Sequence, residues 1–110
     1  MAFDIQLADR IRKTLAKQKG LAEKKMFGGI GFLLNGNMCC GVIGAEMVLR
    51  LDPEQTEKAL SHKYTRIFDF SGRPMKGWIY VGGKAIEKGN DLKHWLRIGT
   101  KYASSLPPKK

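Results

Sequence analysis

Apolar residues along the chain follow two periods, one helical and one extended, and the change from one to the other predicts the elements. Leu7, Ile11 and Leu15 fall at i, i+4 and i+8, which is the spacing of a helix that buries one face. Asp4 precedes this stretch and has the side chain of a good N-cap. The pattern therefore predicts a first helix from residue 5 to about residue 18, with its apolar stripe against a sheet.

The Asn35-Gly36 pair is the strongest local turn signal in the chain. A type I′ turn needs positive φ at both central residues, and Asn-Gly meets that requirement readily. Apolar, β-compatible residues flank the pair over 30–34 and 38–43, which predicts an antiparallel hairpin. A second turn leads into residues 47–51, whose first, third and fifth members are predicted to face inward. These three strands should form a meander.

The second half of the chain predicts a helix, two strands and a helix. Asp52 and Pro53 begin a short helix that ends near residue 60, with Asp52 as N-cap and Pro53 at the first helical position. Strands are predicted over 66–70 and 75–81, and an amphipathic helix begins near residue 90. The predicted order is α-βββ-α-ββ-α. We therefore expect an α+β fold, a two-layer sandwich in which helices pack on a mainly antiparallel sheet.

Length and composition favour one cytoplasmic domain. The chain has 110 residues, 43% of them hydrophobic, which is enough for a packed core. No apolar run approaches the roughly 20 residues that span a bilayer, and the first residues lack the pattern of a secretory signal. The two cysteines are neighbours, so no disulfide framework is expected. We expect a single domain over residues 1–106 and a flexible basic tail over residues 107–110.

The chain is strongly basic. Twenty Lys and Arg against ten Asp and Glu give a formal net charge of +10, which favours a polyanionic partner such as nucleic acid. Two rows of cations follow helical spacing on the outer faces of the first and last predicted helices. If both helices pack on one side of the sheet, the rows can merge into a patch for nonspecific phosphate contact; otherwise each row is an ordinary solvated helix face. The six candidate contact residues are Arg10, Lys13, Lys17, Lys93, Arg97 and Lys101.

The glycine-rich stretch around the hairpin and the two cysteines are the candidates for an enzymatic site. Neither G-x-G-x-x-G nor the P-loop pattern occurs at a strand–helix junction, so the glycines are interpreted as backbone features. Cys39 and Cys40 are expected to point to opposite faces of a strand, which would prevent joint metal ligation. His62 and His94 lie in different elements without a nearby cysteine or carboxylate pattern. We expect no enzyme activity, cofactor or metal; the alternative is a small enzyme or an accessory protein of RNA modification.

Two blocks of sequence carry a family resemblance. The first combines M-F-G-G with the hairpin N-G-N-M and a strand ending at Asp52, and the second is R-P-M-K-G-W. Together with residues 95–103 they make the chain similar to the N-terminal domain of the TfoX/Sxy family over about residues 5–105. The resemblance implies the two-layer fold shared with secretion-chaperone-like domains. The signature residues with an expected structural role are Met26, Phe27, Gly28, Gly29, Asn35, Gly36, Pro74 and Gly77.

The resemblance also implies a kind of function. TfoX/Sxy regulators are transcriptional co-activators that work with the cyclic-AMP receptor protein at competence promoters, and they usually carry a second, C-terminal domain. The family brings no established catalytic residues, so none is assigned here. We therefore expect a stand-alone, non-enzymatic regulatory or interaction domain. Its expected partners are a protein such as a transcription factor, nucleic acid, or both; a membrane is not expected, and exposed edge strands leave homodimerisation open.

Overall fold

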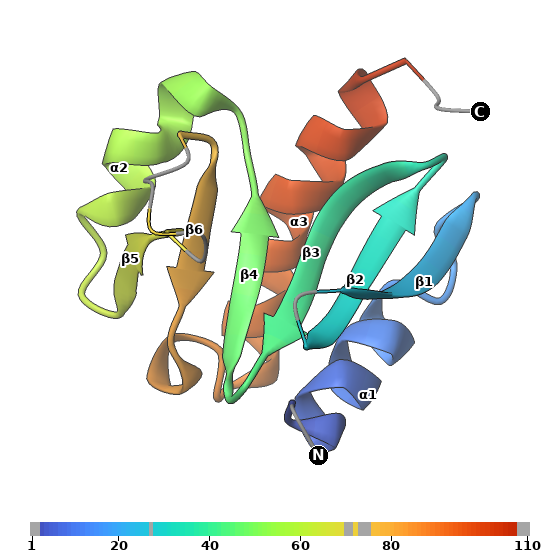
Figure 1. The fold of residues 1–110 in the computed structure, drawn as a ribbon, viewed down its shortest axis with the longest axis horizontal. Helices are drawn as coiled ribbons and strands as arrows, with labels where there is room; N and C mark the ends of the chain where they lie inside the picture. The colour runs from blue at the N-terminus through green and yellow to red at the C-terminus, as the bar shows by residue number, and fades with distance from the viewer. Residues whose placement is uncertain (1–2, 27, 70–71, 73–75, 108–110) are drawn as a thin grey trace.

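The structure is a computed structural model that describes residues 3–26, 28–69, 72 and 76–107. All the described strands lie between α1 and α3 in chain order, and the short helix α2 lies between the fourth and fifth strands (Figure 1). In chain order the elements are α1 (Ile5–Thr14), β1 (Leu21–Met26), β2 (Gly29–Leu34), β3 (Asn37–Ile43), β4 (Glu46–Arg50), the 3₁₀ turn η1 (Pro53–Gln55), α2 (Thr56–Leu60), β5 (Thr65–Ile67), β6 (Trp78–Val81), the 3₁₀ turn η2 (Gly83–Ala85) and α3 (Gly89–Ser105).

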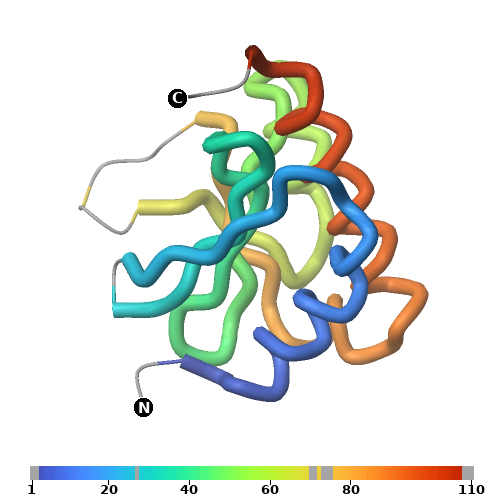
Figure 2. The backbone as a smooth tube through the Cα atoms, turned by 90° about the vertical axis from the view of Figure 1, so that its right-hand side faces the viewer, coloured from blue at the N-terminus to red at the C-terminus, as the bar shows by residue number. Residues whose placement is uncertain are grey.

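The six strands of the described residues form one antiparallel sheet in the order β1-β2-β3-β4-β6-β5. Helices α1 and α3 contact each other on the same face of this sheet, and α2 packs beside β5 and β6 at one end (Figure 1). Figure 2, turned by 90°, shows the strands as one layer and α1 and α3 as the other. The arrangement confirms the predicted α+β class and its helices on an antiparallel sheet.

The core lies between the helices and the sheet. Leu7 and Ile11 of α1 and Leu92 and Leu96 of α3 are buried, as the helical periodicity predicted. The strands contribute alternate residues to the same core, since successive side chains of a strand point to opposite faces. These residues are Phe32, Leu34, Val42, Met47, Leu49, Ile79 and Val81, and Leu51, directly after β4, joins the same core.

The β2–β3 hairpin turns at the predicted pair. Asn35 and Gly36 have φ of 52° and 83°, and Leu34 pairs with Asn37 across them. Both central residues therefore lie in the left-handed region that a type I′ turn requires. The buried Asn37 side chain donates from Nδ2 to the carbonyl oxygen of Pro107 at 2.9 Å. This hydrogen bond joins the hairpin to the segment that follows α3; the rest of the predicted tail, residues 108–110, lies outside the described residues.

Several boundaries differ from the sequence prediction. Helix α1 ends at Thr14, short of residue 18. The segment after it forms an additional strand, β1, which has four exposed residues in its centre. The strands predicted over 66–70 and 75–81 are the shorter β5 and β6. The predicted ends of those strands, Phe70 and Met75, lie outside the described residues.

The expectation that Cys39 and Cys40 point to opposite faces is wrong. The pairing of β2 with β3 changes register by one residue, since Phe32 pairs with Cys40 but Leu33 pairs with Met38. Cys39 is thus the extra residue of a β-bulge, which breaks the alternation of side chains. Both cysteines are fully buried and belong to the core cluster beneath the helices.

Helix α3 lies very close to the sheet at Gly99. A Cβ atom placed there would lie 2.7 Å from Cδ1 of Leu49, 3.0 Å from the carbonyl oxygen of Cys39 and 3.2 Å from its Sγ. A side chain larger than hydrogen would therefore push the helix away from β3 and β4. The glycine allows α3 to lie directly over the bulge, and this position fixes where the basic side chains of α3 emerge.

Candidate functional site

The first candidate site is a shallow groove between α1 and α3, which we call the α1–α3 groove. Lys93 and Arg97 lie one helical turn apart on α3 and contribute its positive charge. No carboxylate lines the groove within the described residues. The groove has a volume of about 230 Å³ and is lined by Thr14, Leu15, Gln18, Lys93, Leu96, Arg97 and Thr100. Cationic side chains without acidic neighbours suit a phosphate group better than a metal cation.

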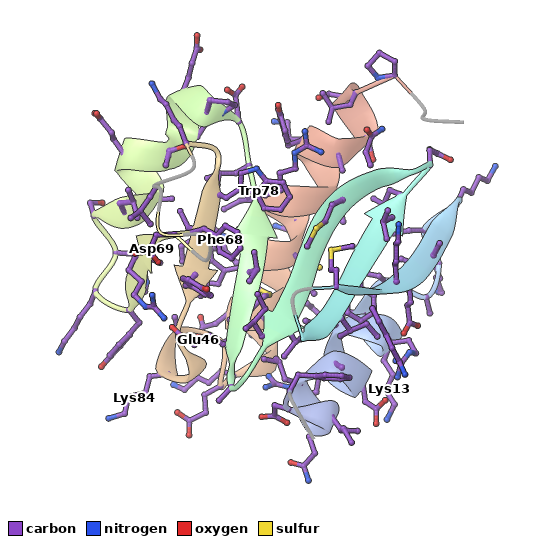
Figure 3. All side chains as sticks on the ribbon, viewed as in Figure 1. Lys13, Glu46, Phe68, Asp69, Trp78 and Lys84 are labelled. Carbon is purple, nitrogen blue, oxygen red and sulfur yellow. The ribbon has the colours of Figure 1, made fainter. Side chains whose placement is uncertain are left out.

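Two further predicted cations lie in the segment that supplies one wall of this groove. Lys13 belongs to the last turn of α1, and Lys17 lies in the turn that follows; both are exposed. Each is next in sequence to a groove residue, Thr14 or Gln18. Figure 3 shows Lys13 beside α1, at the opposite lower corner from Lys84. The structure therefore places two of the six predicted cations in the lining of the groove and two more next in sequence to lining residues.

Arg10 has a different position from its predicted partners. Its guanidinium donates from Nη2 to the carbonyl oxygens of Ile86 and Glu87, at 2.7 and 3.1 Å. These carbonyls belong to the segment between η2 and α3, so Arg10 joins the first helix to the approach of the last one. A guanidinium engaged in this way is not directed at an external anion.

An ion pair that the sequence pattern did not indicate holds α1 to the edge strand β1. Arg12 donates from Nε and Nη2 to the two carboxylate oxygens of Glu23, both at 2.6 Å, and it also pairs with Asp9. The hydrogen bonds from Arg12 lower the pKa of Glu23. The same hydrogen bonds raise the pKa of Arg12. Arg12 is therefore already satisfied by two acidic side chains of its own chain.

The sixth predicted cation, Lys101, lies on the other side of α3. It lines a depression of about 400 Å³ that adjoins a second of about 550 Å³, and the two share the lining residues Gln55 and Ile98. We call these two adjoining depressions together the α2–α3 groove. The residues that line it are Leu51, Asp52, Gln55, Lys58, Ala59, Ser61, His62, His94, Trp95, Ile98, Lys101, Tyr102 and Ser105. The structure thus separates Lys101 from Lys93 and Arg97 and does not merge all six cations into one patch.

The α2–α3 groove gathers two histidines around one tryptophan. The ring centres of His62 and His94 lie 5.2 and 5.6 Å from that of Trp95, and both rings meet it edge-on. His62 follows α2 and His94 belongs to α3, so the packing of the two helices brings them together. Nothing in the sequence spacing indicated this meeting, because thirty-two residues separate the two histidines.

The face of the sheet opposite the helices carries a second apolar cluster. Its members are Val48, Phe68 and Tyr80, with Ile43 and Trp78 packed against them. Figure 3 looks onto this face and labels Phe68 and Trp78. Arg66 places Cζ 4.0 Å from the centre of the Tyr80 ring and pairs with Glu46 at 2.5 Å. The guanidinium covers Tyr80, and burial raises the pKa of its hydroxyl, so this cluster is packed within the fold and is not an open stacking surface.

The described part of the chain offers little metal or thiol chemistry. It contains no group of three or more His, Cys, Asp or Glu side chains that could hold a metal ion. It also contains no helix with the length and apolar character to cross a bilayer.

The hydrogen bond with Cys39, and then burial, raise the pKa of Cys40. Its thiol is therefore protonated at neutral pH and is a poor nucleophile.

The family-signature residues lie at turns and close backbone contacts. Met26 ends β1, and Gly28, with φ of 74°, turns the chain into β2. Gly29 follows at a point where a Cβ atom would lie 1.9 Å from the carbonyl oxygen of Val42. Strand β3 therefore leaves no room for a side chain at Gly29.

The second signature block is anchored by hydrogen bonds at Gly77. Its N–H donates to Oγ1 of the buried Thr56 at 2.9 Å, and its carbonyl oxygen accepts from the N–H of Leu51 at 2.9 Å. The block is thereby held to the start of α2 and the end of β4. The signature residues Phe27 and Pro74 lie outside the described residues.

Comparison with known proteins identifies the family. The model of the TfoX N-terminal domain matches residues 13–103, which is most of the 110-residue chain. The chain therefore belongs to the TfoX N-terminal domain family, as its two sequence blocks predicted. The match begins within α1 and ends within α3, so it includes both sides of the α1–α3 groove. No curated protein and no solved structure gave a match.

Proposed function

We propose that this TfoX-type domain is a non-enzymatic regulatory domain that contacts the phosphate backbone of nucleic acid through the α1–α3 groove. One observation carries the proposal: within the described residues, Lys93 and Arg97 line a groove without carboxylates, and exposed Lys13 and Lys17 are next in sequence to its lining residues Thr14 and Gln18. The net charge of +10 supports attraction of a polyanion. Family membership supports a regulatory role. A cytoplasmic location, expected from the sequence, is part of this proposal.

The groove chemistry favours backbone contact over base recognition. Lys93 and Arg97 are separated by four residues, or about 6 Å along the helix axis, so both can reach one short run of phosphates. The Arg97 guanidinium can donate two parallel hydrogen bonds to one phosphate, whereas the lysines act as point charges. In the described part of the chain, the lining of this groove includes no aromatic ring on which a base could stack. We therefore expect binding that depends on charge and is nearly independent of sequence.

A salt titration of duplex DNA binding tests the proposal. If Lys13, Lys17, Lys93 and Arg97 each contact one phosphate, the slope of log K against log salt should be about −3.6. Affinity should then fall about 150-fold between 50 and 200 mM salt. Fluorescence anisotropy of a labelled duplex measures both quantities. The double variant Lys93→Gln/Arg97→Gln should reduce the slope to about −1.8, since two of the four contacts are removed.

The matched control removes two charges elsewhere. Lys63 and Lys84 are exposed and line neither groove. The variant Lys63→Gln/Lys84→Gln should therefore keep the slope of the wild type. Equal loss of affinity in both double variants would show that net charge alone attracts the DNA. That result, or no binding even at low salt, would refute a nucleic-acid contact at the α1–α3 groove.

A further inference from the structure

We propose that the α2–α3 groove is a docking site for a short acidic peptide segment of a protein partner. The proposed occupant carries one or two apolar side chains for the floor of the groove and carboxylates for its rim. This site shares no lining residue with the α1–α3 groove. The inference goes beyond the proposed nucleic-acid contact, and either can hold without the other.

The floor of the groove is apolar and only partly covered. Leu51 and Trp95 are buried beneath it, whereas Ala59 and Ile98 are half-buried and keep part of their surface available. Ile98 lines both depressions and so lies in the middle of the groove. Volumes of about 400 and 550 Å³ fall within the range of about 300–1,000 Å³ typical of small-ligand pockets. An apolar side chain seated beside Ile98 would bury surface on both partners.

The groove also has the length of a peptide segment. His94 and Ser105 mark its two ends on α3. A rise of about 1.5 Å per residue makes this span about 16 Å. An extended chain advances about 3.3 Å per residue, so about five peptide residues would fill the groove.

Charge complementarity identifies an acidic occupant. Lys58 and Lys101 stand on opposite walls, one on α2 and one on α3, and neither forms an ion pair within the described residues. The guanidinium of Arg50 lies beside the groove, between the ring of Tyr102 on the α3 wall and that of Trp78, with its Cζ 5.6 and 5.3 Å from their centres.

Among the described residues, Asp52 is the one carboxylate that lines the groove. Asp52 accepts a hydrogen bond from the N–H of Glu54 at 2.9 Å and so caps the 3₁₀ turn η1. The polar remainder includes side chains that can donate hydrogen bonds to carboxylates or to peptide carbonyls. These are Gln55, Tyr102 and the two histidines. The hydroxyls of Ser61 and Ser105 already donate to the carbonyl oxygens of Lys58 and Tyr102, both at 2.6 Å.

A titration observed by NMR tests this docking site directly. The probe is a ¹⁵N-labelled sample of the whole chain, titrated with a synthetic peptide that has glutamates on both sides of two leucines. The chain has two tryptophans, and the ring of Trp78 lies on the other side of the sheet. The variant Trp78→Phe assigns the two indole N–H signals. The Trp95 signal should move with saturation, and it should move more than that of Trp78.

Two pairs of variants measure the contribution of charge. Lys58→Glu/Lys101→Glu reverses the charge at the rim of the groove and should weaken binding of the peptide by about tenfold or more. Lys24→Glu/Lys84→Glu makes the same change in net charge at exposed lysines away from the groove and should leave the affinity within about twofold. Lys93→Gln/Arg97→Gln should also leave peptide binding unchanged, which separates this site from the proposed DNA contact.

A second peptide, with serines in place of the two leucines, tests the apolar floor. It should bind much more weakly, because charge alone would not seat it in the groove. Equal binding of the two peptides, equal losses in both reversal variants, or a Trp95 signal that stays fixed would overturn the proposal. If duplex DNA moves the Trp95 signal and Lys58→Glu/Lys101→Glu abolishes that shift, the groove is part of a nucleic-acid surface and the peptide site is wrong.

Discussion

Replacing Gly99 with alanine tests the contact that places α3 on the sheet. In an isolated helix, alanine is more favourable than glycine by about 1 kcal/mol. In this fold the new methyl group would lie 2.7 Å from Cδ1 of Leu49 and 3.0 Å from the carbonyl oxygen of Cys39. Leu49 is fully buried, and the carbonyl belongs to the bulged strand, so neither can move freely. Overpacking of this kind costs about 1–3 kcal/mol.

We expect the strain to exceed the gain in helix propensity. With a cost of about 3 kcal/mol and a gain of about 1 kcal/mol, Gly99→Ala should lower the free energy of unfolding by about 2 kcal/mol. For a chain of this length, that corresponds to a fall in Tm of about 8 °C. Urea unfolding followed by circular dichroism measures the change as a lower midpoint with an unchanged slope.

A control within the same helix separates packing from propensity. Gly89 begins α3, and a Cβ atom there would meet no other atom within 4 Å. Gly89→Ala should therefore be neutral or slightly stabilising, by no more than about 1 kcal/mol. In a double-mutant cycle, Leu49→Val should recover about 1 kcal/mol of the loss caused by Gly99→Ala, because it removes the nearest atom. A Gly99→Ala protein as stable as the wild type would show that α3 does not lie this close to the bulge.

Two further predictions concern a buried hydrogen bond and an ion pair. Thr56→Val should lower the free energy of unfolding by about 1–3 kcal/mol, because it leaves the buried N–H of Gly77 without its acceptor; Thr56→Ser should retain most of the stability, and urea unfolding compares the three proteins. Glu23→Gln should cost about 0.5 kcal/mol at pH 7, since the pair with Arg12 is partly exposed. Arg12 lowers the pKa of Glu23, so this contribution is present above the carboxyl pKa of the unfolded chain, about 4.3. It should disappear as the pH falls through the lower folded value, and an unchanged difference between the two proteins at pH 2.5 would contradict the assignment.

The elements that the sequence predicts well are those with strong local signals. The Asn35-Gly36 turn requires positive φ at two positions, and few other conformations satisfy an Asn-Gly pair between apolar flanks. The long helix α3 was predicted to begin within a residue or two of Gly89, because its apolar positions follow the helical period over four turns. The inward residues of β4 follow from strict alternation. In each case the information lies within a few neighbouring residues.

Features that depend on distant pairing escaped prediction. β1 is an edge strand, and its exposed centre, with Lys24 and Lys25, reads as a polar loop because only its pairing with β2 makes it a strand. The bulge at Cys39 arises from the register between β2 and β3, which no single strand reveals.

The two grooves depend on tertiary packing in the same way. The helical spacing of Lys93, Arg97 and Lys101 suggested one row of charge. The rows of α1 and α3 do lie on one side of the sheet, which was the condition for the two rows to merge into one patch. Lys101, however, lies on the side of α3 that faces α2 and lines the second groove. Arg10 donates hydrogen bonds to backbone carbonyls just before α3. The positions of neighbouring helices decide which cations lie together, and they are not encoded in the period of one helix.

The most direct test of the central claim is a map of amide chemical shifts during titration with duplex DNA at low salt. The claim is that the paired helices, and not the sheet, face the nucleic acid. We predict that the shifts concentrate at Thr14, Gln18, Lys93, Arg97 and Thr100 and diminish as salt is added. Shifts concentrated instead on the opposite face of the sheet, around Trp78 and Tyr80, would contradict the account, as would a spectrum that the DNA leaves unchanged.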